Sequence, residues 1–136
     1  AASDVYKRQA LVGDEAFWYD SNALAVPATE QRPDLVIVVA DNDGAGIFST
    51  LEQGQPAYSR HFERVFGVPM GVQIASLATS FGASVCEVND ADELATAVAE
   101  RLSDGVHVIV VRTCDRGVEA ELLTSVRDAV RQAIDV

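Results

Sequence analysis

Two polar segments follow the two strand-like stretches in the first third of the chain. A Gly-Asp pair at positions 13–14 follows the short apolar stretch 10–12, and the sequence Asp-Asn-Asp-Gly-Ala-Gly at 41–46 follows the apolar run 35–40. Open α/β sheets bind their ligands at the carboxyl ends of parallel strands, where such short polar side chains would lie. For either segment alone, a tight turn rich in Asn, Asp and Gly is the alternative interpretation.

The spacing of the two segments favours a shared magnesium site. Asp14 and Asn42 are 28 residues apart (42 − 14), about one strand–helix–strand unit, so adjacent parallel strands would bring both side chains to one sheet edge. A carboxylate, an amide oxygen and a backbone carbonyl are hard ligands, and Mg²⁺ completes its octahedron with phosphate oxygens and water. Gly44, Gly46 and the segment starting at Ile47 would offer backbone N–H groups to the same phosphates. The pattern therefore predicts a Mg²⁺-bridged diphosphate.

Strand-like runs alternate with helical patterns along the rest of the chain. The runs lie at 10–12, 35–40, 84–88 and 106–111. The helical patterns lie at 15–25, 47–51, 61–66, 74–81, 90–105 and 118–134, with 53–60 as an irregular loop. No hairpin signal separates the strands, which indicates right-handed crossovers and a mostly parallel sheet. The predicted fold class is α/β, a three-layer sandwich.

Two helical patterns carry specific signals. Asp90 with Glu93 three residues later is typical of a capping box at a helix start. The last helix carries its apolar residues on one face, namely Leu122, Leu123, Val126, Val130 and Ile134.

Size and charge narrow the class of protein. The 136 residues are enough for one domain with a single core, and 49% of them are hydrophobic. The formal net charge of -11 disfavours nucleic acid and anionic membrane surfaces as partners, because both require a basic face. No apolar run reaches the length of a membrane span and no signal peptide is apparent, so a cytoplasmic location is predicted.

Residues 1–9 are not included in the predicted fold. The sequence Asp-Val-Tyr-Lys-Arg-Gln at 4–9 resembles the translation of a transposon adaptor used in sequencing libraries. We therefore predict that 1–9 is a non-native segment, and that 10–136 is a domain truncated at its amino end.

A longer set of motifs resembles one family of thiamine-diphosphate enzymes. The Gly-Asp pair and the loop 41–44 resemble the signature commonly written G-D-G followed by N-N. More specific are Asp20 and Asn22, the sequence NDGAGIFS at 42–49 and FERVFGVP at 62–69. Together they resemble 2-succinyl-5-enolpyruvyl-6-hydroxy-3-cyclohexene-1-carboxylate synthase (MenD) of menaquinone biosynthesis. The resemblance implies that residues 10–136 are that family's C-terminal, diphosphate-binding domain with the thiamine-diphosphate-binding fold.

The resemblance also implies residue roles. Mg²⁺ would be bound by the side chains of Asp14 and Asn42 and the carbonyl of Gly44. The cofactor would contact Gly13, Asp14, Asn42, Gly44, Gly46 and Ile47, and the substrate pocket would include Phe48 and Leu51. No catalytic residue is assigned to this chain, because the family's activating glutamate comes from an amino-terminal domain of the partner subunit.

The implied activity belongs to a larger enzyme. Members of the family decarboxylate 2-oxoglutarate, add the resulting carbanion to isochorismate, and work as homo-oligomers. With the activating glutamate in another domain, this fragment is expected to be inactive alone.

Three positions depart from the family pattern, and two other functions stay open. Glu15 replaces a glycine or apolar residue, Asp41 replaces the first asparagine of the loop, and Met70 stands where many relatives have histidine. Glu15 and Asp41 would weaken diphosphate binding unless their side chains point away.

One alternative function is that of an acetolactate-synthase-like or 2-oxo-acid decarboxylase relative. The other is a non-enzymatic acidic α/β domain that binds a divalent ion or a partner protein.

Overall fold

The computed structural model describes residues 8–100 and 105–134, which divide into two compact units. Unit 1 comprises the described residues of Ala1–Asp41 and Val72–Thr113. Unit 2 comprises those of Asn42–Gly71 and Cys114–Val136. The chain therefore passes from one unit to the other within the polar loop that the sequence singled out, between Asp41 and Asn42.

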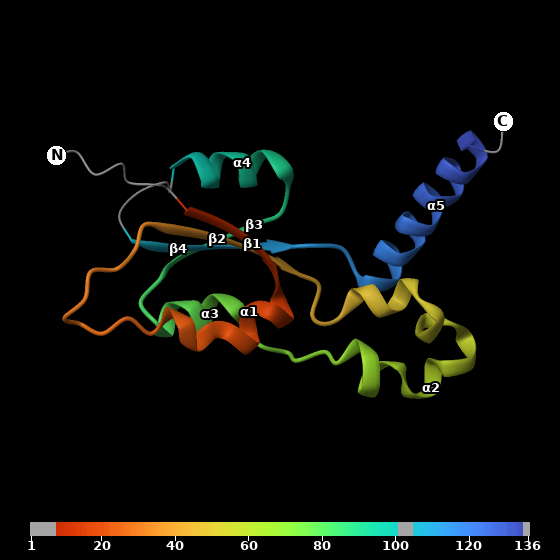
Figure 1. The fold of residues 1–136 in the computed structure, drawn as a ribbon, viewed down its shortest axis with the longest axis horizontal. Helices are drawn as coiled ribbons and strands as arrows, with labels where there is room; N and C mark the ends of the chain where they lie inside the picture. The colour runs from red at the N-terminus through yellow and green to blue at the C-terminus, as the bar shows by residue number, and fades with distance from the viewer. Residues whose placement is uncertain (1–7, 101–104, 135–136) are drawn as a thin grey trace. The chain divides into compact units, whose positions relative to one another are not determined.

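Within the described residues, unit 1 is built on a four-stranded parallel sheet in the order β1-β2-β4-β3 (Figure 1). The strands are β1 (Arg8–Gly13), β2 (Leu35–Asp41), β3 (Ser84–Val88) and β4 (Val106–Arg112). Parallel neighbours need a crossover, and a helix follows each of the first three strands. The predicted α/β class and parallel sheet are confirmed.

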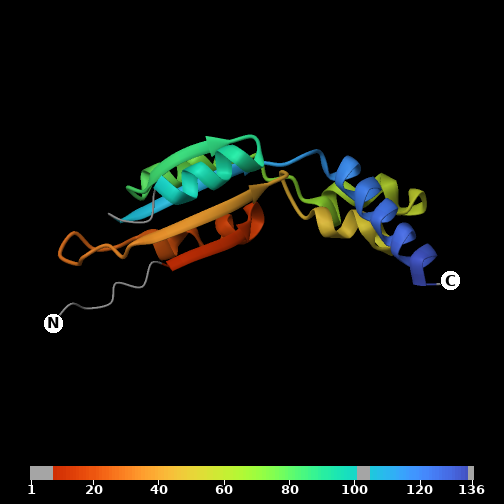
Figure 2. The ribbon, with the colours of Figure 1, turned by 90° about the horizontal axis from the view of Figure 1, so that it is seen from above.

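Helices cover both faces of this sheet (Figures 1 and 2). One face carries α1 (Asp14–Asp20), the 3₁₀ turn η1 (Ser21–Leu24) and α3 (Ile74–Ser80), and the other carries α4 (Ala91–Glu100). The arrangement follows from strand alternation, since Ile37 and Val39 point to the first face and Val36 to the second. Unit 1 is thus the predicted three-layer sandwich.

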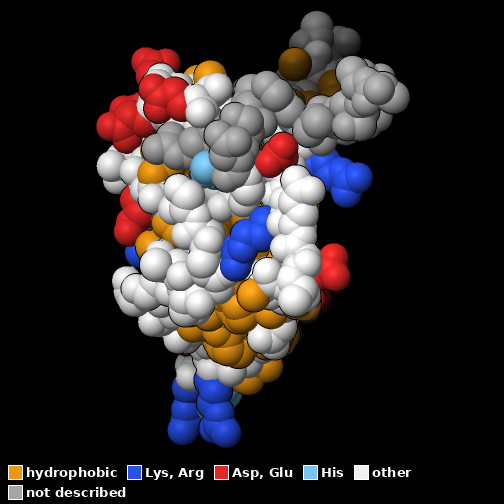
Figure 3. Space-filling view, turned by 90° about the vertical axis from the view of Figure 1, so that its left-hand side faces the viewer, with side chains coloured by type: hydrophobic (Ala, Val, Ile, Leu, Met, Phe, Trp, Pro, Cys, Tyr) orange, Lys and Arg blue, Asp and Glu red, His pale blue; other side chains and the backbone are white. Residues whose placement is uncertain are grey.

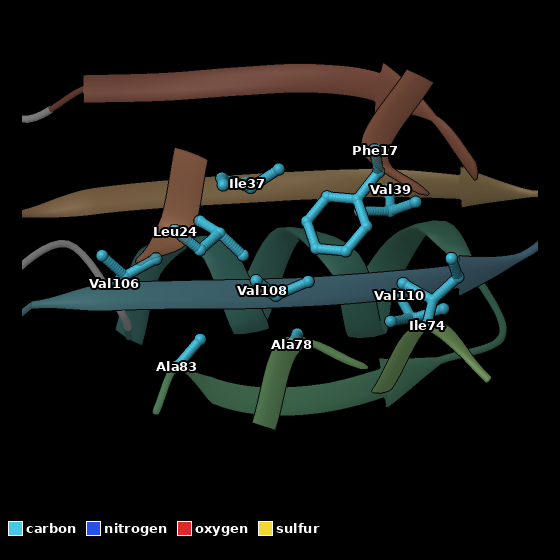
Figure 4. Close-up of a cluster of buried hydrophobic side chains, with 10 residues drawn as sticks. All are labelled: Phe17, Leu24, Ile37, Val39, Ile74, Ala78, Ala83, Val106, Val108 and Val110. Carbon is cyan, nitrogen blue, oxygen red and sulfur yellow. The ribbon is translucent and has the colours of Figure 1, made fainter. Parts of the chain in front are cut away.

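The core of unit 1 lies mainly between the sheet and the α1/α3 layer. Figure 4 shows Phe17 and Leu24 packed over the strand residues Ile37, Val39 and Val108. The last two are fully buried. These apolar, mostly β-branched side chains suit a sheet covered on both faces.

Asp90 caps the start of α4 as predicted, while Glu93 bonds the N–H of Asn89 and not that of Asp90 as a strict capping box would. The backbone N–H of Glu93 donates to Asp90 Oδ1 at 2.8 Å, and the N–H of Asn89 donates to Glu93 Oε2 at 2.9 Å. This helix is described to Glu100, and the predicted continuation over 101–104 lies outside the described residues.

Unit 2 consists of short helical turns and one long helix. Its elements are η2 (Gly46–Thr50), η3 (Glu52–Gly54), η4 (Pro56–Tyr58), α2 (Ser59–Phe62), the π-type turn η5 (Glu63–Gly67) and α5 (Arg116–Ile134). The prediction of an irregular loop at 53–60 was wrong, because Pro56 begins a 3₁₀ turn and Ser59 Oγ donates to its carbonyl at 2.9 Å. Proline suits a first helical position, where its missing N–H costs no hydrogen bond.

Packing in unit 2 is aromatic near η2 and sparse along α5. The rings of Phe48 and Phe66 lie 5.6 Å apart between centroids, and Phe62 lies 6.2 Å from Phe66. The apolar residues predicted for one face of α5 are all exposed, at 46–74% of their surface. Contacts that position α5 are therefore concentrated in its first turn.

The surface is chemically mixed. Figure 3 shows acidic side chains and a patch of hydrophobic side chains on the same face. Among the described residues, no helix combines the length and the apolar character needed to cross a membrane.

Candidate functional site

Asp14 occupies the carboxyl end of β1. The strand ends level with β2, because Gly13 pairs with Ala40 in the parallel register. Gly13 is the N-cap of α1 and Asp14 is its first residue, with 8% of its surface exposed. Its Oδ1 accepts the backbone N–H of Glu15 at 2.8 Å. Unit 1 therefore presents a buried carboxylate at the strand end where the sequence predicted a metal ligand.

Asp41 is the last residue of β2, and its carboxylate forms an ion pair with an arginine. Its side chain is 4% exposed, and Asp41 Oδ2 accepts a hydrogen bond from Arg112 Nη1 on the neighbouring strand β4. Its carbonyl accepts the backbone N–H of Thr113 at 3.1 Å. The guanidinium of Arg112 offsets part of the negative charge that the sequence indicated as unfavourable for a diphosphate. Sequence inspection missed Arg112, because only the strand register pairs it with Asp41.

The loop after β2 is held in a conformation that requires glycine. Gly44 is buried with φ +130°, and the preceding Asp43 is left-handed with φ 56°. Asp43 Oδ1 accepts the backbone N–H of Gly71 at 3.0 Å, while the N–H of Ala45 donates to the carbonyl of Gly67 at 3.0 Å. Within unit 2, residues 43–45 are thus hydrogen-bonded to the segment 67–71.

Asn42 is half-buried and contacts the first turn of α5. Its Nδ2 donates to Glu119 Oε2 at 3.0 Å. An alanine Cβ at position 46 would lie 2.6 Å from Asn42 Nδ2 and 3.0 Å from Glu119 Oε2. Gly46 therefore provides the space in which these two side chains meet. Sequence inspection did not identify Glu119, which lies 77 positions from its partner.

Gly46→Ala is expected to push the Asn42 amide away from Glu119. The added methyl would overlap the amide nitrogen, which can move because it ends a side chain, so the cost should lie at the low end of the about 1–3 kcal/mol typical of overpacking. We expect a lower free energy of unfolding by urea and a shifted ¹⁵N resonance of the Asn42 side-chain amide. Gly13→Ala is the control, because a Cβ there meets nothing within 4 Å and its φ of -78° suits alanine. Equal stability of the two variants would contradict the prediction.

Three apolar residues predicted for the cofactor or substrate pocket lie on or beside η2. Ile47 and Leu51 are 62% and 48% exposed, so neither belongs to the core of unit 2. Phe48 is half-buried against Phe66. The pocket-lining roles stay predictions, and the exposed pair is available for contact with another molecule.

The donor set fits magnesium better than a softer metal. Over 8–100 and 105–134, no three or more His, Cys, Asp or Glu side chains gather into a metal-binding group. The predicted ligands include one carboxylate (Asp14), one amide oxygen (Asn42) and one backbone carbonyl (Gly44). So few hard protein ligands suit Mg²⁺ that also binds phosphate oxygens and water.

Comparison with known protein families gives one match over most of the chain. The family model described as "Thiamine pyrophosphate enzyme, C-terminal TPP binding domain" matches residues 3–111. That range includes both polar segments, the strands β1, β2 and β3, and all of β4 except its last residue, Arg112.

Several relatives are 2-succinyl-5-enolpyruvyl-6-hydroxy-3-cyclohexene-1-carboxylate synthases. The protein of Saccharopolyspora erythraea is 45% identical over 124 residues, which is 89% of this chain and 22% of the relative. That of Rhodococcus erythropolis is 45% identical over 119 residues (87% and 22%), and that of Thermobifida fusca is 43% identical over 126 residues (92% and 21%). The chain thus spans about a fifth of the length of these relatives.

A solved structure supports the same fold. Benzoylformate decarboxylase from Polynucleobacter necessarius superimposes with a TM-score of 0.57 and 29% sequence identity, covering 77% of this chain and 19% of that chain. The resemblance to the MenD family that the motifs predicted is confirmed by the synthase relatives.

Proposed function

Because the chain belongs to the family of thiamine pyrophosphate enzyme C-terminal TPP-binding domains, we propose that it binds the diphosphate of thiamine diphosphate through Mg²⁺. The enzyme it serves would be a MenD-type synthase acting on 2-oxoglutarate and isochorismate, as a homo-oligomer. The 45% identity to two of the synthases, against 29% to the decarboxylase, favours this reaction class over a 2-oxo-acid decarboxylase.

The loop at 41–46 is the observation that carries the proposal. In this assignment Asp14, Asn42 and the carbonyl of Gly44 hold Mg²⁺, while Gly13, Gly46 and Ile47 contact the cofactor. The buried carboxylate at the end of β1 and the buried, positive-φ glycine at position 44 support these roles. The ion pair of Asp41 with Arg112, which also lies 3.7 Å from Glu87, would lessen the negative charge that opposes a diphosphate.

The chemistry divides between cofactor and protein. Bound thiamine diphosphate supplies the electron sink for decarboxylation and carbon–carbon bond formation. The protein residues would orient the cofactor: backbone N–H groups of the loop would donate to the phosphates, and bound Mg²⁺ would offset the repulsion expected from a chain of net charge -11. Phe48 and Leu51 would contact the substrates beside η2.

Binding of thiamine diphosphate, titrated by calorimetry with and without Mg²⁺, tests the proposal. Binding is the readout because the resemblance places the activating glutamate outside this chain. We expect binding that requires Mg²⁺ and weakens at least tenfold in Asn42→Ala, which removes one oxygen ligand. Asn89→Ala, at an exposed asparagine of unit 1, should bind as the wild type does. Metal binding indifferent to thiamine diphosphate would instead favour the non-enzymatic acidic domain.

A further inference from the structure

The first turn of α5 is held firmly against the loop of unit 2. Arg116 Nη2 donates to Glu63 Oε2 at 2.7 Å, and only 14% of the Arg116 side chain is exposed. Asp115 caps the helix, since its Oδ1 accepts the N–H of Gly117 at 2.7 Å and its carbonyl accepts the N–H of Glu119 at 3.0 Å. The side chain of Glu119 therefore projects from a fixed point of the backbone.

The hydrogen bond between Asn42 and Glu119 fixes the orientation of the Asn42 amide, with its nitrogen toward Glu119. An ionised carboxylate only accepts hydrogen bonds, so the group facing Glu119 Oε2 has to be the Asn42 NH₂. The carbonyl oxygen, Oδ1, then points away from Glu119. Metal ions are bound by the amide oxygen and not by the amide nitrogen, so this orientation is the one a metal ligand requires.

We propose that Glu119 is a positioning residue that holds Asn42 with its amide oxygen presented to the metal. The inference rests on the proposed function, because it assumes that Asn42 ligates Mg²⁺. It adds Glu119 of α5 to the proposed site, a residue outside both polar segments and outside the range 3–111 that the family model matches. Outer groups that orient metal ligands commonly change metal affinity 10–100-fold when removed.

Gly46 supports the same geometry. The space that a side chain at position 46 would fill is bounded by both Asn42 Nδ2 and Glu119 Oε2. Glu119 is half-buried, and so is Asn42, so water competes with their hydrogen bond less than it would at an open surface.

A purely structural role for Glu119 is the rival explanation, in which the bond merely attaches α5 to the loop. Such a role would lower the melting temperature without changing the Mg²⁺ requirement of the folded protein. The conservative variant Glu119→Gln separates the positioning role from the structural one, because the carbonyl oxygen of the glutamine can still accept a hydrogen bond from the Asn42 amide.

The test is a Mg²⁺ titration of the 136-residue chain at fixed thiamine diphosphate. We expect Glu119→Ala to raise the half-saturating Mg²⁺ concentration about tenfold, Glu119→Gln to stay within about twofold of the wild type, and the exposed control Glu121→Ala to be unchanged. A wild-type Mg²⁺ requirement in Glu119→Ala, or equal loss in the Gln and Ala variants, would overturn the proposal.

Two further readouts keep the outcomes distinguishable. If Asn42→Ala leaves the Mg²⁺ requirement unchanged, the metal assignment fails and this inference fails with it. If Asn42→Ala loses binding while Glu119→Ala does not, only the role of Glu119 is refuted.

The NMR spectrum of the ¹⁵N-labelled side-chain amide of Asn42 is a readout that needs no bound cofactor. Its resonances should shift in Glu119→Ala and return toward wild type in Glu119→Gln, and unchanged resonances in Glu119→Ala would also overturn the proposal.

Discussion

Gly44→Ala is expected to abolish Mg²⁺-dependent binding of thiamine diphosphate and to destabilise the loop of unit 2 by about 3 kcal/mol or more. Two effects act together. The φ of +130° is a conformation that side chains rarely adopt, and a Cβ at this position would overlap the carbonyl oxygen of Gly67. Because the overlapping atom belongs to the backbone, no rotamer change relieves it. The loop would have to move, and the proposed carbonyl ligand of Gly44 would move with it.

Gly71→Ala is the matched control for this variant. Gly71 belongs to the same unit and also has a positive φ, +60°, but a Cβ there meets nothing within 4 Å. Its cost should be the left-handed penalty alone, about 1 kcal/mol. Hydrogen exchange of the Ala45 amide, which donates to Gly67, reports the loop directly. Comparable exchange rates in the two alanine variants would contradict the argument.

The sheet was predictable because its central strands, β2 and β4, are apolar on both faces. Runs such as 35–40 contain mostly β-branched residues, and only a strand covered by helices on both sides buries them all. Val39 and Ile109 lie on opposite faces and are both fully buried, as that pattern requires. Periodicity alone did not indicate that β4 lies between β2 and β3, since strand order depends on crossovers rather than on local sequence.

The candidate site was predictable only where its residues are local in sequence. Asn42 and Gly44 stand out because a polar, glycine-containing loop follows a buried strand. Arg112 and Glu119 did not, since they reach Asp41 and Asn42 from 71 and 77 positions away. At those separations the partner is set by strand register and by the start of α5, neither of which leaves a periodic pattern in the sequence.

The helical turns of 52–60 show that turn residues alone do not predict the structure of the segment that contains them. Gly54 and Pro56 usually indicate irregular chain, and here they belong to successive 3₁₀ turns. Turn residues mark the end of regular elements but do not distinguish an open loop from short 3₁₀ segments, which tolerate proline at their first position.

Arg112→Leu is expected to lower the free energy of unfolding by about 2–3 kcal/mol. Removing one partner of a buried ion pair leaves the other charge uncompensated, which costs about 3–5 kcal/mol when both are buried. Asp41 is 4% exposed but the Arg112 side chain is 42% exposed, so solvent screening reduces the effect. Urea unfolding measures it, and Arg127→Leu is the control because its pair with Asp128 is exposed on both sides and should contribute less than about 0.5 kcal/mol.

The double variant Arg112→Leu/Asp41→Asn separates charge from packing. If the loss arises from the Asp41 charge that Arg112 no longer offsets, making residue 41 neutral should restore more than half of it, because the amide is cheaper to bury than the charge. Asp41→Asn alone should destabilise less than Arg112→Leu, since the arginine it leaves behind is partly exposed to water. Failure of the second substitution to restore stability would show that Arg112 acts through its packing on β4 or through its pair with Glu87. The charge of Asp41 would then have to be offset by another group before the end of β2 could lie beside a diphosphate.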